Sequence, residues 1–237
     1  LEGYSGLLIM TRRLRQFFEE KLKYKKKLIV INNFTERRRF DHQNSYNDGK
    51  GEKYIFVSGC LKDSKDGIIS FLPVFSDINR IYSDIKLKIA AYGTNDQIEV
   101  LRKYIQDNSM ENEISYLGEI SQWDLAYVAT NAYILINPRP SGMQNEYGFP
   151  TKLIEFLNCK KPVISSRTGD IDFFFTDMKD CLLYKPDDLN ELEEKIKWVI
   201  LNYKAALKIA IEGNILVNNY FDPAREVEKF ISCFGNK

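Results

Sequence analysis

The sequence has little of several features that define common classes of protein. It holds a single histidine, His42, and four cysteines, Cys60, Cys159, Cys181 and Cys233, which lie far apart and form no C-x-x-C pair. Such a set favours neither a zinc site nor a disulfide framework, and it fits a reducing compartment. No apolar run approaches the length of a membrane span, and no signal-peptide pattern is present. We therefore expect a cytoplasmic protein with no metal ion, in which His42 is a solvated loop residue.

The sequence also has no excess of charge of one sign. Its 34 lysines and arginines face 33 aspartates and glutamates, so the whole protein has no pull toward nucleic acid. The 237 residues are enough for one large domain or two small ones. The chain begins at Leu1 without a methionine, within an apolar and basic pattern, which is typical of a boundary inside a longer protein.

Basic side chains gather at the start of the chain, in residues 1–40. An apolar run at 6–10 leads to Thr11, which we expect to cap a helix at 12–23, and a strand-like run follows at 28–32. The basic helix presents either a solvated face or a contact for anionic lipid or an acidic partner. Residues 41–52 are polar and predict a linker.

From residue 54 onward, strand-like and helical patterns alternate. Strands are predicted at 54–58, 87–92, 113–117, 133–136, 162–165 and 181–184. Helices are predicted at 68–75, 96–106, 120–130, 151–158, 189–203, 205–220 and 224–234. Asp187 and Asp188 are expected to cap the fifth of these helices, and Asp222 with Pro223 to start the last. This order predicts an α/β fold with a Rossmann-like, doubly wound parallel sheet.

The loop between the predicted strands at 133–136 and 162–165 is the most informative stretch. It is long, rich in proline and glycine, and leads into a helix that starts near Pro150. The first turn of such a helix offers free N–H groups and a positive dipole to an anion such as phosphate, and Lys152 adds a formal charge there. Glu155, on the same helical face, is placed to accept hydrogen bonds from sugar hydroxyls. The alternative is an ordinary i,i+3 ion pair between Lys152 and Glu155.

A second candidate anion site follows the first strand of this series, at 54–58. Gly59 ends the strand, Lys62 and Lys65 lie in the next loop, and a helix follows. A doubly wound fold presents this place to a diphosphate. The same pattern also suits an ordinary strand-to-helix turn, so the two interpretations stay open on the pattern alone.

The stretch NPRP at 137–140, followed by GFPTKLIEFLNCKKPVIS at 148–165, resembles the donor site of retaining glycosyltransferases of family 4, which have the GT-B architecture. The family pattern is NPRP, a variable loop, then F-P-(Ser/Thr)-K-x-x-E-(Tyr/Phe)-L-x-x-x-K-P-V-I. The matching residues are Asn137, Pro138, Arg139, Pro140, Phe149, Pro150, Thr151, Lys152, Glu155, Phe156, Lys161, Pro162, Val163 and Ile164. The resemblance covers residues 54–237 and, more weakly, residues 1–34.

The resemblance implies a nucleotide-diphosphate sugar as donor, with no metal ion and no further cofactor. It assigns Lys65 and Lys152 to the diphosphate and Glu155 to the nucleotide ribose, and these three are the expected catalytic residues. The other donor-binding positions that it implies are Gly59, Lys62, Gly118, Glu146, Gly148, Phe149, Pro150 and Thr151. Gly118 lies in a turn whose backbone holds the nucleotide base, so the sequence does not reveal which base is bound.

Three positions depart from the family pattern. Cys60 stands where an arginine that contacts the diphosphate is usual, and Asp66 stands where glycine is usual. Tyr147 stands where many members have a glutamate that contacts the donor sugar. The candidate replacements are Lys62 for the arginine and Asn145 or Glu146 for the glutamate.

The resemblance also predicts how the chain is divided and what it does. Residues 1–45 are expected to end an N-terminal domain and form the interdomain linker, residues 46–218 to bind the nucleotide sugar, and residues 219–237 to form a C-terminal helix. The expected function is retaining hexosyl transfer to a polysaccharide or lipid-linked acceptor in surface polysaccharide or glycoconjugate synthesis. Peripheral contact with the inner face of the plasma membrane and a homodimer are further expectations.

Two other classes of protein stay open at this stage. One is a non-catalytic module that binds a nucleotide or phosphosugar through the same loops. The other is an unrelated doubly wound domain, such as a flavodoxin-like one, whose phosphate loop is rich in serine and threonine, unlike residues 59–65. Because the chain lacks most of an acceptor-binding half, it is expected to be inactive by itself under the glycosyltransferase interpretation.

Overall fold

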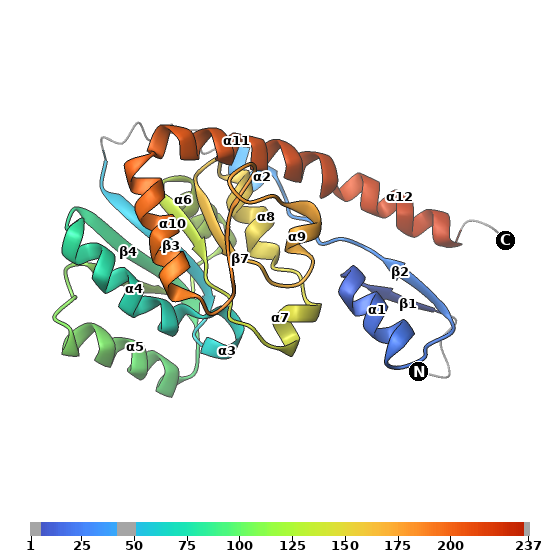
Figure 1. Cartoon of the computed structure of the whole chain (residues 1–237), viewed down its shortest axis with the longest axis horizontal. Coiled ribbons are helices and arrows are strands. Elements are labelled where there is room, and N and C mark those ends of the chain that lie inside the picture. The colour runs from blue at the N-terminus through green and yellow to red at the C-terminus, as the bar shows by residue number, and fades with distance from the viewer. Residues whose placement is uncertain (1–5, 42–50, 235–237) are drawn as a thin grey trace.

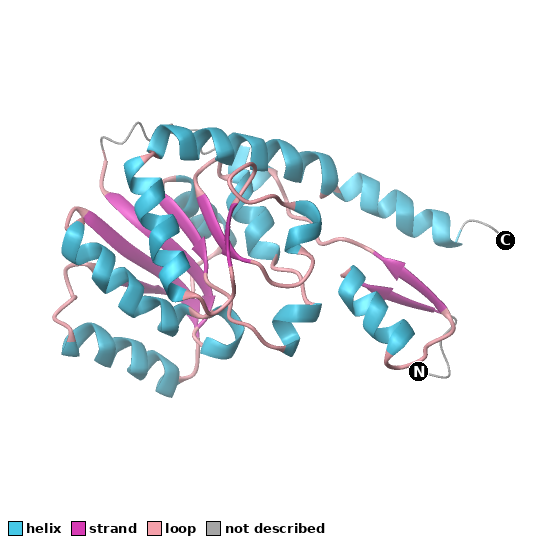
Figure 2. Cartoon of the chain, in the orientation of Figure 1, coloured by secondary structure: helices cyan, strands magenta, loops and turns pink. Residues whose placement is uncertain are grey.

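The computed structural model describes residues 6–41 and 51–234. Six parallel strands form one sheet in the order β5-β4-β3-β6-β7-β8. Figure 2 shows this sheet as the larger group of magenta arrows, with cyan helices around it. The strands are β3 (Lys53–Cys60), β4 (Ile85–Tyr92), β5 (Ile114–Gly118), β6 (Ile134–Asn137), β7 (Val163–Ser166) and β8 (Leu182–Tyr184). The chain builds outward from β3 to the edge at β5 and then crosses back to place β6 on the other side of β3. The predicted doubly wound α/β class is confirmed, and its switch point lies between β3 and β6.

Helices cover both faces of this sheet, as its parallel strands require (Figure 1). The helices are α4 (Ile68–Ile81), α5 (Asn95–Asp107), α6 (Gln122–Thr130), α8 (Thr151–Asn158), α10 (Leu189–Leu201) and α11 (Tyr203–Tyr220). One apolar core joins α4, α5 and α10 to the sheet, for example through Phe71, Leu101 and Ile196. A second core joins α6 and α8 to the opposite face through Ala126 and Phe156. These cores hold the strand ends in place.

Four one-turn helices were not predicted from the sequence. They are α2 (Arg38–Asp41), α3 (Asp63–Asp66), α7 (Met143–Tyr147) and α9 (Ile171–Phe174). A single turn is too short for a helical period to show in the sequence, and such turns form only when the surrounding fold holds them. The predicted end of the helix at residue 75 was also wrong, because α4 continues to Ile81 and buries Ile78 completely.

The first residues form a separate small unit beside the large sheet (Figure 1). Strands β1 (Gly6–Ile9) and β2 (Lys27–Val30) pair in parallel, with α1 (Arg12–Glu20) between them. Thr11 caps α1 as predicted, since its hydroxyl accepts from the N–H of Leu14 at 3.1 Å. The same hydroxyl donates to the carbonyl of Tyr147 at 2.7 Å, and the ring of Phe17 lies 4.9 Å from the Tyr147 ring. The start of α1 therefore rests against α7.

The last helix, α12 (Pro223–Phe234), returns toward the small unit (Figure 1). Asp222 caps it as predicted, accepting from the N–H groups of Ala224 and Arg225. In its first turn, the buried carboxylate of Glu226 accepts two hydrogen bonds from Asn32, one from the main chain and one from the side chain. The segment that leaves β2 is thus tied to the end of the chain.

Several expectations from the sequence concern residues that the structure describes only in part. His42, most of the predicted linker at 41–52 and the side chain of Cys233 lie outside the described residues. Cys159 and Cys181 are buried free thiols, and burial raises the pKa of each. Within residues 6–41 and 51–234, no helix combines the length and the apolar character needed to cross a membrane. The division at residues 45 and 218 stays a prediction.

Candidate functional site

A cavity of about 220 Å³ opens at the carboxyl ends of β3 and β6. It is lined by Lys65, Asp66, Asn137, Arg139, Phe149, Pro150, Thr151 and Lys152. Its walls come from three places: the loop after β3, the NPRP segment after β6, and the start of α8. This is the switch point of the sheet, where open α/β folds bind their ligands.

Three larger hollows lie elsewhere over the described residues. One of about 530 Å³ is a surface depression over residues 185–190. A second, of about 560 Å³, lies between residues 35–38, α8 and residues 217–224, and a third, of about 280 Å³, lies between α4 and residues 108–113. None of the three is lined by Lys62, Lys65 or Lys152. The smaller cavity is the better candidate site because it brings together residues from both of the predicted anion-binding loops.

The start of α8 forms one wall of this cavity. Pro150 precedes the helix, and no side chain of the described residues caps it. The Thr151 hydroxyl accepts a hydrogen bond at 3.0 Å from the side chain of Asn33, which also donates to the carbonyl of Phe149. The N–H groups of the first turn therefore face the cavity region with a positive helix dipole behind them.

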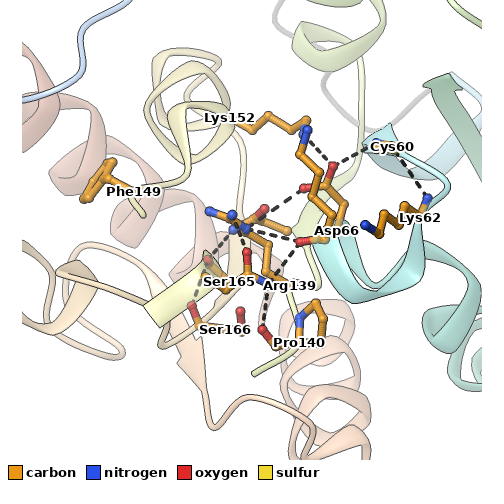
Figure 3. Close-up of polar contacts among 12 residues, drawn as sticks. Cys60, Lys62, Asp66, Arg139, Pro140, Phe149, Lys152, Ser165 and Ser166 are labelled. Carbon is orange, nitrogen blue, oxygen red and sulfur yellow. Dashed lines mark hydrogen bonds and ion pairs between the residues drawn. The ribbon is translucent and has the colours of Figure 1, made fainter. Parts of the chain in front are cut away.

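Asp66 lies at the centre of the charged groups (Figure 3). Its carboxylate accepts from the N–H of Cys60 at 2.8 Å and from the ammonium of Lys152 at 3.1 Å. The Arg139 Nε lies 4.0 Å from the other carboxylate oxygen. Asp66 is only 4% exposed, whereas the Lys152 side chain is 26% exposed and reaches solvent. A buried carboxylate thus holds the two cations together.

The NPRP segment is fixed by a network around Arg139. The guanidinium donates to the side-chain oxygen of Asn145, whose amide donates to the carbonyls of Lys65 at 3.1 Å and Pro140 at 2.8 Å. Burial lowers the pKa of the Arg139 guanidinium, and the Asp66 carboxylate opposes that shift. Asn137 donates to the Ser165 hydroxyl at 2.9 Å on the neighbouring strand. These bonds join α3, β6, α7 and β7 into one framework.

Lys65 on α3 and Lys152 on α8 both line the cavity, so the structure brings together the two lysines predicted to bind the diphosphate. The ammonium of Lys65 donates to the hydroxyl of Tyr92 at 2.9 Å, and this bond raises the pKa of the lysine. The ammonium is therefore held beside Tyr92 at the end of β4 and carries its charge. The role of the two lysines in binding a diphosphate stays a prediction.

Glu155 lies one turn farther along α8 and outside the lining of the cavity. One of its carboxylate oxygens lies 3.1 Å from the guanidinium of Arg39 on α2. On the sequence, Lys152 was the alternative ion-pair partner of Glu155. In the structure, the ammonium of Lys152 donates to the carboxylate of Asp66 instead. The assignment of Glu155 to a ribose stays a prediction.

The structure spreads the other predicted donor-binding residues more widely. Gly59 adjoins Asp66 and Lys152, whereas Gly118 is the last residue of the edge strand β5 and Lys62 is exposed at the start of α3.

Among the lining residues, Phe149 packs its ring in an aromatic cluster with Phe174 and Phe221. Gly148 ends α7, and Glu146 forms an ion pair with Arg13 of the small unit. The roles proposed for these residues stay predictions.

Several residues of the site received no role from the sequence. Arg139 and Asn137 belong to the NPRP motif, so the motif itself was their signal. Asp66 stood out only as a departure from the family pattern. Asn33 and Arg39 left no signal, because each meets α8 across more than a hundred residues of sequence.

A doubly wound sheet with a cavity at its switch point, lined by three cations and one carboxylate, defines a Rossmann-like α/β domain. The chain belongs to the glycosyl transferases group 1 family, whose model matches residues 52–202. An uncharacterized glycosyltransferase of Methanocaldococcus jannaschii is 25% identical over 199 residues, which are 83% of this chain and 50% of that protein.

Solved structures show the same fold. Sucrose-phosphate synthase from Thermosynechococcus elongatus matches 97% of this chain and 57% of its own, with a TM-score of 0.80 and 18% identity. HepE from Anabaena, solved in complex with UDP-glucose, matches 98% of this chain and 64% of its own, with a TM-score of 0.80 and 14% identity. The fold is thus that of GT-B glycosyltransferases. This chain spans half of the curated relative and less than two thirds of either solved chain.

Proposed function

We propose that this chain is the donor-binding part of a retaining glycosyltransferase of family 4 that uses a nucleotide-diphosphate sugar. The observation that carries the proposal is the cavity at the switch point, where Lys65, Arg139 and Lys152 meet the start of α8. Three cations against one carboxylate, Asp66, leave a positive charge for a diphosphate. The likeness to HepE, which was solved with UDP-glucose, supports a donor of this kind.

In this proposal, the bond between the sugar and the diphosphate breaks and negative charge grows on the leaving diphosphate. Lys65, Lys152 and the N–H groups of the first turn of α8 stabilise that charge without a metal ion. Arg39 engages one oxygen of Glu155, so the second oxygen is the one proposed to accept from the ribose hydroxyls. Thr151 contributes its N–H group and its hydroxyl, which accepts from Asn33 and can still donate its own proton to a phosphate oxygen.

The acceptor and the place of action belong to the same proposal. The acceptor is a polysaccharide or a lipid-linked saccharide, and the protein works in the cytoplasm at the inner face of the plasma membrane. Exposed lysines between α1 and β2, such as Lys21, Lys23 and Lys25, support contact with anionic lipid. A homodimer through the apolar side of α1 has weaker support, because Phe17 and Phe18 are half-buried against Tyr147 and Tyr24.

A non-catalytic module that binds a nucleotide or phosphosugar is the second candidate. One observation favours it: Tyr147 stands at the usual glutamate position, and the carboxylate of the neighbouring Glu146 pairs with Arg13. If no other carboxylate takes over the contact with the donor sugar, the site would bind a donor but transfer nothing.

Binding and transfer measured side by side separate these candidates. Calorimetry with UDP, GDP and ADP, and saturation-transfer NMR with their sugar conjugates, should show binding to the 237-residue chain. Because acceptor positioning supplies much of the rate, the chain should transfer sugar at a negligible rate while the longer protein that contains it transfers sugar with retention. Absence of binding to every nucleoside diphosphate contradicts the first candidate and a nucleotide-binding module. A longer protein that binds donor but never transfers supports the second candidate.

A further inference from the structure

The proposed chemistry has no use for Asp66, although this residue has the most buried charge of the site. A carboxylate inside an anion-binding cavity repels the ligand that the cavity is proposed to hold. Asp66 nevertheless lines the cavity and directly contacts Lys152, one of the two lysines assigned to the diphosphate. Its presence therefore calls for a physical account.

The structure leaves Asp66 no room to turn away. Its carboxylate is held by the N–H of Cys60 and by Lys152 (Figure 3). A Cβ atom at Gly59 would lie 2.5 Å from the carboxylate and 2.8 Å from the Lys152 ammonium, so the strand end is shaped around this ion pair. The carboxylate is therefore a fixed part of the site.

Two opposite effects on ligand binding follow from this geometry. Asp66 orders the long side chain of Lys152, which is worth about 3- to 10-fold in affinity for whatever that lysine binds. Asp66 also opposes the ligand's negative charge. A phosphate oxygen on the far side of the ammonium would lie about 6 Å from the carboxylate, and at an effective dielectric constant of about 20 the repulsion is worth about 100-fold. The repulsion is therefore the larger effect.

We propose that Asp66 is a built-in counter-anion of the donor site, which shares Lys152 with the diphosphate and so weakens the binding of nucleoside diphosphates. The inference rests on the proposed function, since it assigns the anion to a diphosphate. In the empty site, Asp66 balances the charges of Lys152 and Arg139. In the occupied site, it competes for the ammonium of Lys152. The nucleoside diphosphate left after transfer is thereby released more readily.

The test replaces Asp66 by asparagine, which keeps the shape and an acceptor for the Cys60 N–H but removes the charge. Calorimetry on the full chain compares Asp66→Asn with the wild type, using the diphosphate among UDP, GDP and ADP that binds best, beside its monophosphate. The variant should bind the diphosphate about 10-fold more tightly or better, since the repulsion outweighs the lost ordering. The monophosphate, with less charge near Lys152, should gain less. Asp63→Asn, on the same short helix but outside the cavity, is the matched control and should change neither affinity.

A double-mutant cycle tests whether the effect passes through Lys152. In the Lys152→Met background there is no lysine left to order, so the gain from Asp66→Asn should be about 3- to 10-fold larger than in the wild type. A gain of equal or smaller size in that background overturns the sharing of Lys152. Equal or weaker diphosphate binding by a folded Asp66→Asn variant overturns the proposal and leaves Asp66 a positioning or structural residue.

Folding and function are controlled separately. Melting temperatures show whether Asp66→Asn folds, and Asp66→Ser is the second variant if it does not. A purely structural role would lower the melting temperature and leave the ratio of diphosphate to monophosphate affinity unchanged. If the wild type binds none of the three diphosphates, the proposed function is wrong, and the inference about Asp66 is wrong for the same reason. If the wild type binds and only the variants fail to gain affinity, the inference alone is wrong.

Discussion

The guanidinium of Arg39 lies 3.1 Å from the carboxylate of Glu155, and the two side chains are only 7% and 15% exposed. The pair joins α2 to α8 across the face of the sheet that carries the second core. Because the start of α8 lines the cavity, this ion pair fixes the helix whose first turn is proposed to hold the diphosphate. The position of Glu155, the residue assigned to the ribose, therefore depends on Arg39, which lies far from it in the sequence.

Removing Glu155 should therefore cost stability. Glu155→Ala removes the buried partner of the Arg39 guanidinium and leaves it the exposed Glu36 at 4.0 Å, so we expect a loss of about 3 kcal/mol in the free energy of unfolding. Urea titration followed by circular dichroism measures it. The exposed pair of Arg15 and Glu19 is the control, since Glu19→Ala should cost less than about 0.5 kcal/mol. Equal losses in the two variants would contradict the structural role of the buried pair.

Glu155→Gln tests the contact with ribose, since it keeps one acceptor oxygen and the shape of the side chain. We expect the variant to bind the nucleoside diphosphate more weakly than the wild type. Loss of the 2′-hydroxyl from the nucleotide should then matter less in the variant than in the wild type. Calorimetry with 2′-deoxy and ribo nucleotides gives both penalties, and identical penalties would refute the assignment.

Lys152→Ala should affect both binding and folding. Loss of a charge-assisted hydrogen bond should weaken diphosphate binding by about 1.5–3 kcal/mol. A lysine at the exposed start of a helix would not by itself affect folding, but this one balances the buried Asp66. We therefore also expect a loss of about 1–3 kcal/mol in stability, the cost of leaving a buried acceptor short of a partner. Calorimetry measures the loss of affinity, and urea titration measures the loss of stability. An unchanged affinity for the diphosphate would contradict the role of Lys152 in binding it.

Gly59→Ala tests how tightly the end of β3 is packed against the ion pair. Gly59 has a φ of +149°, and an added Cβ would meet the carboxylate of Asp66 and the ammonium of Lys152. Gly142 has a similar φ of +141° but open space around the position of a Cβ, so Gly142→Ala reports backbone strain alone. Both should lose about 1–3 kcal/mol of stability from strain. Only Gly59→Ala should also change the affinity for the diphosphate, which calorimetry measures in both variants. An equal effect of the two substitutions on that affinity would contradict the packing of Gly59 against the ion pair.

Asn145→Ala should loosen the NPRP segment. The buried Asn145 amide bridges the carbonyls of Lys65 and Pro140 and accepts from Arg139. Its removal leaves several buried groups without a partner, so we expect a loss of about 2–3 kcal/mol in the free energy of unfolding. Asn108→Ala removes one exposed hydrogen bond to Tyr104 and should cost less than about 0.5 kcal/mol. A comparable loss in both would show that the bridge does not hold the loop.

The long elements of this fold were predictable because their patterns are local. The strand that became β3 contains the apolar run at 54–57 and has seven of its eight residues buried, as parallel strands covered on both faces require. Caps at Thr11 and Asp188 were predicted for the same reason, since each lies within three residues of the N–H that it accepts. Asp187, by contrast, adopts a left-handed φ of +67° and does not cap the helix.

The site was predictable only where a motif carried it. Lys65 and Lys152 were found from their place in the two anion-binding loops, and the cavity brings them together. The partners of these residues were not found, because Asp66 meets Lys152 across 86 residues and Arg39 meets Glu155 across 116. Such pairings depend on how helices cross in space, which no local pattern encodes.

The two hydrogen bonds from Asn32 to the buried carboxylate of Glu226 have a mechanical consequence. They join the segment that leaves β2 to α12, and β2 is itself paired with β1. The shortest path of contacts between the two described ends of the chain therefore bypasses the six-stranded sheet. A pulling force applied between those ends would load the β1–β2 pairing, the Asn32–Glu226 contact and the hydrogen bonds from the start of α1 to Tyr147 and Asp170 before it reached the strands that shape the cavity.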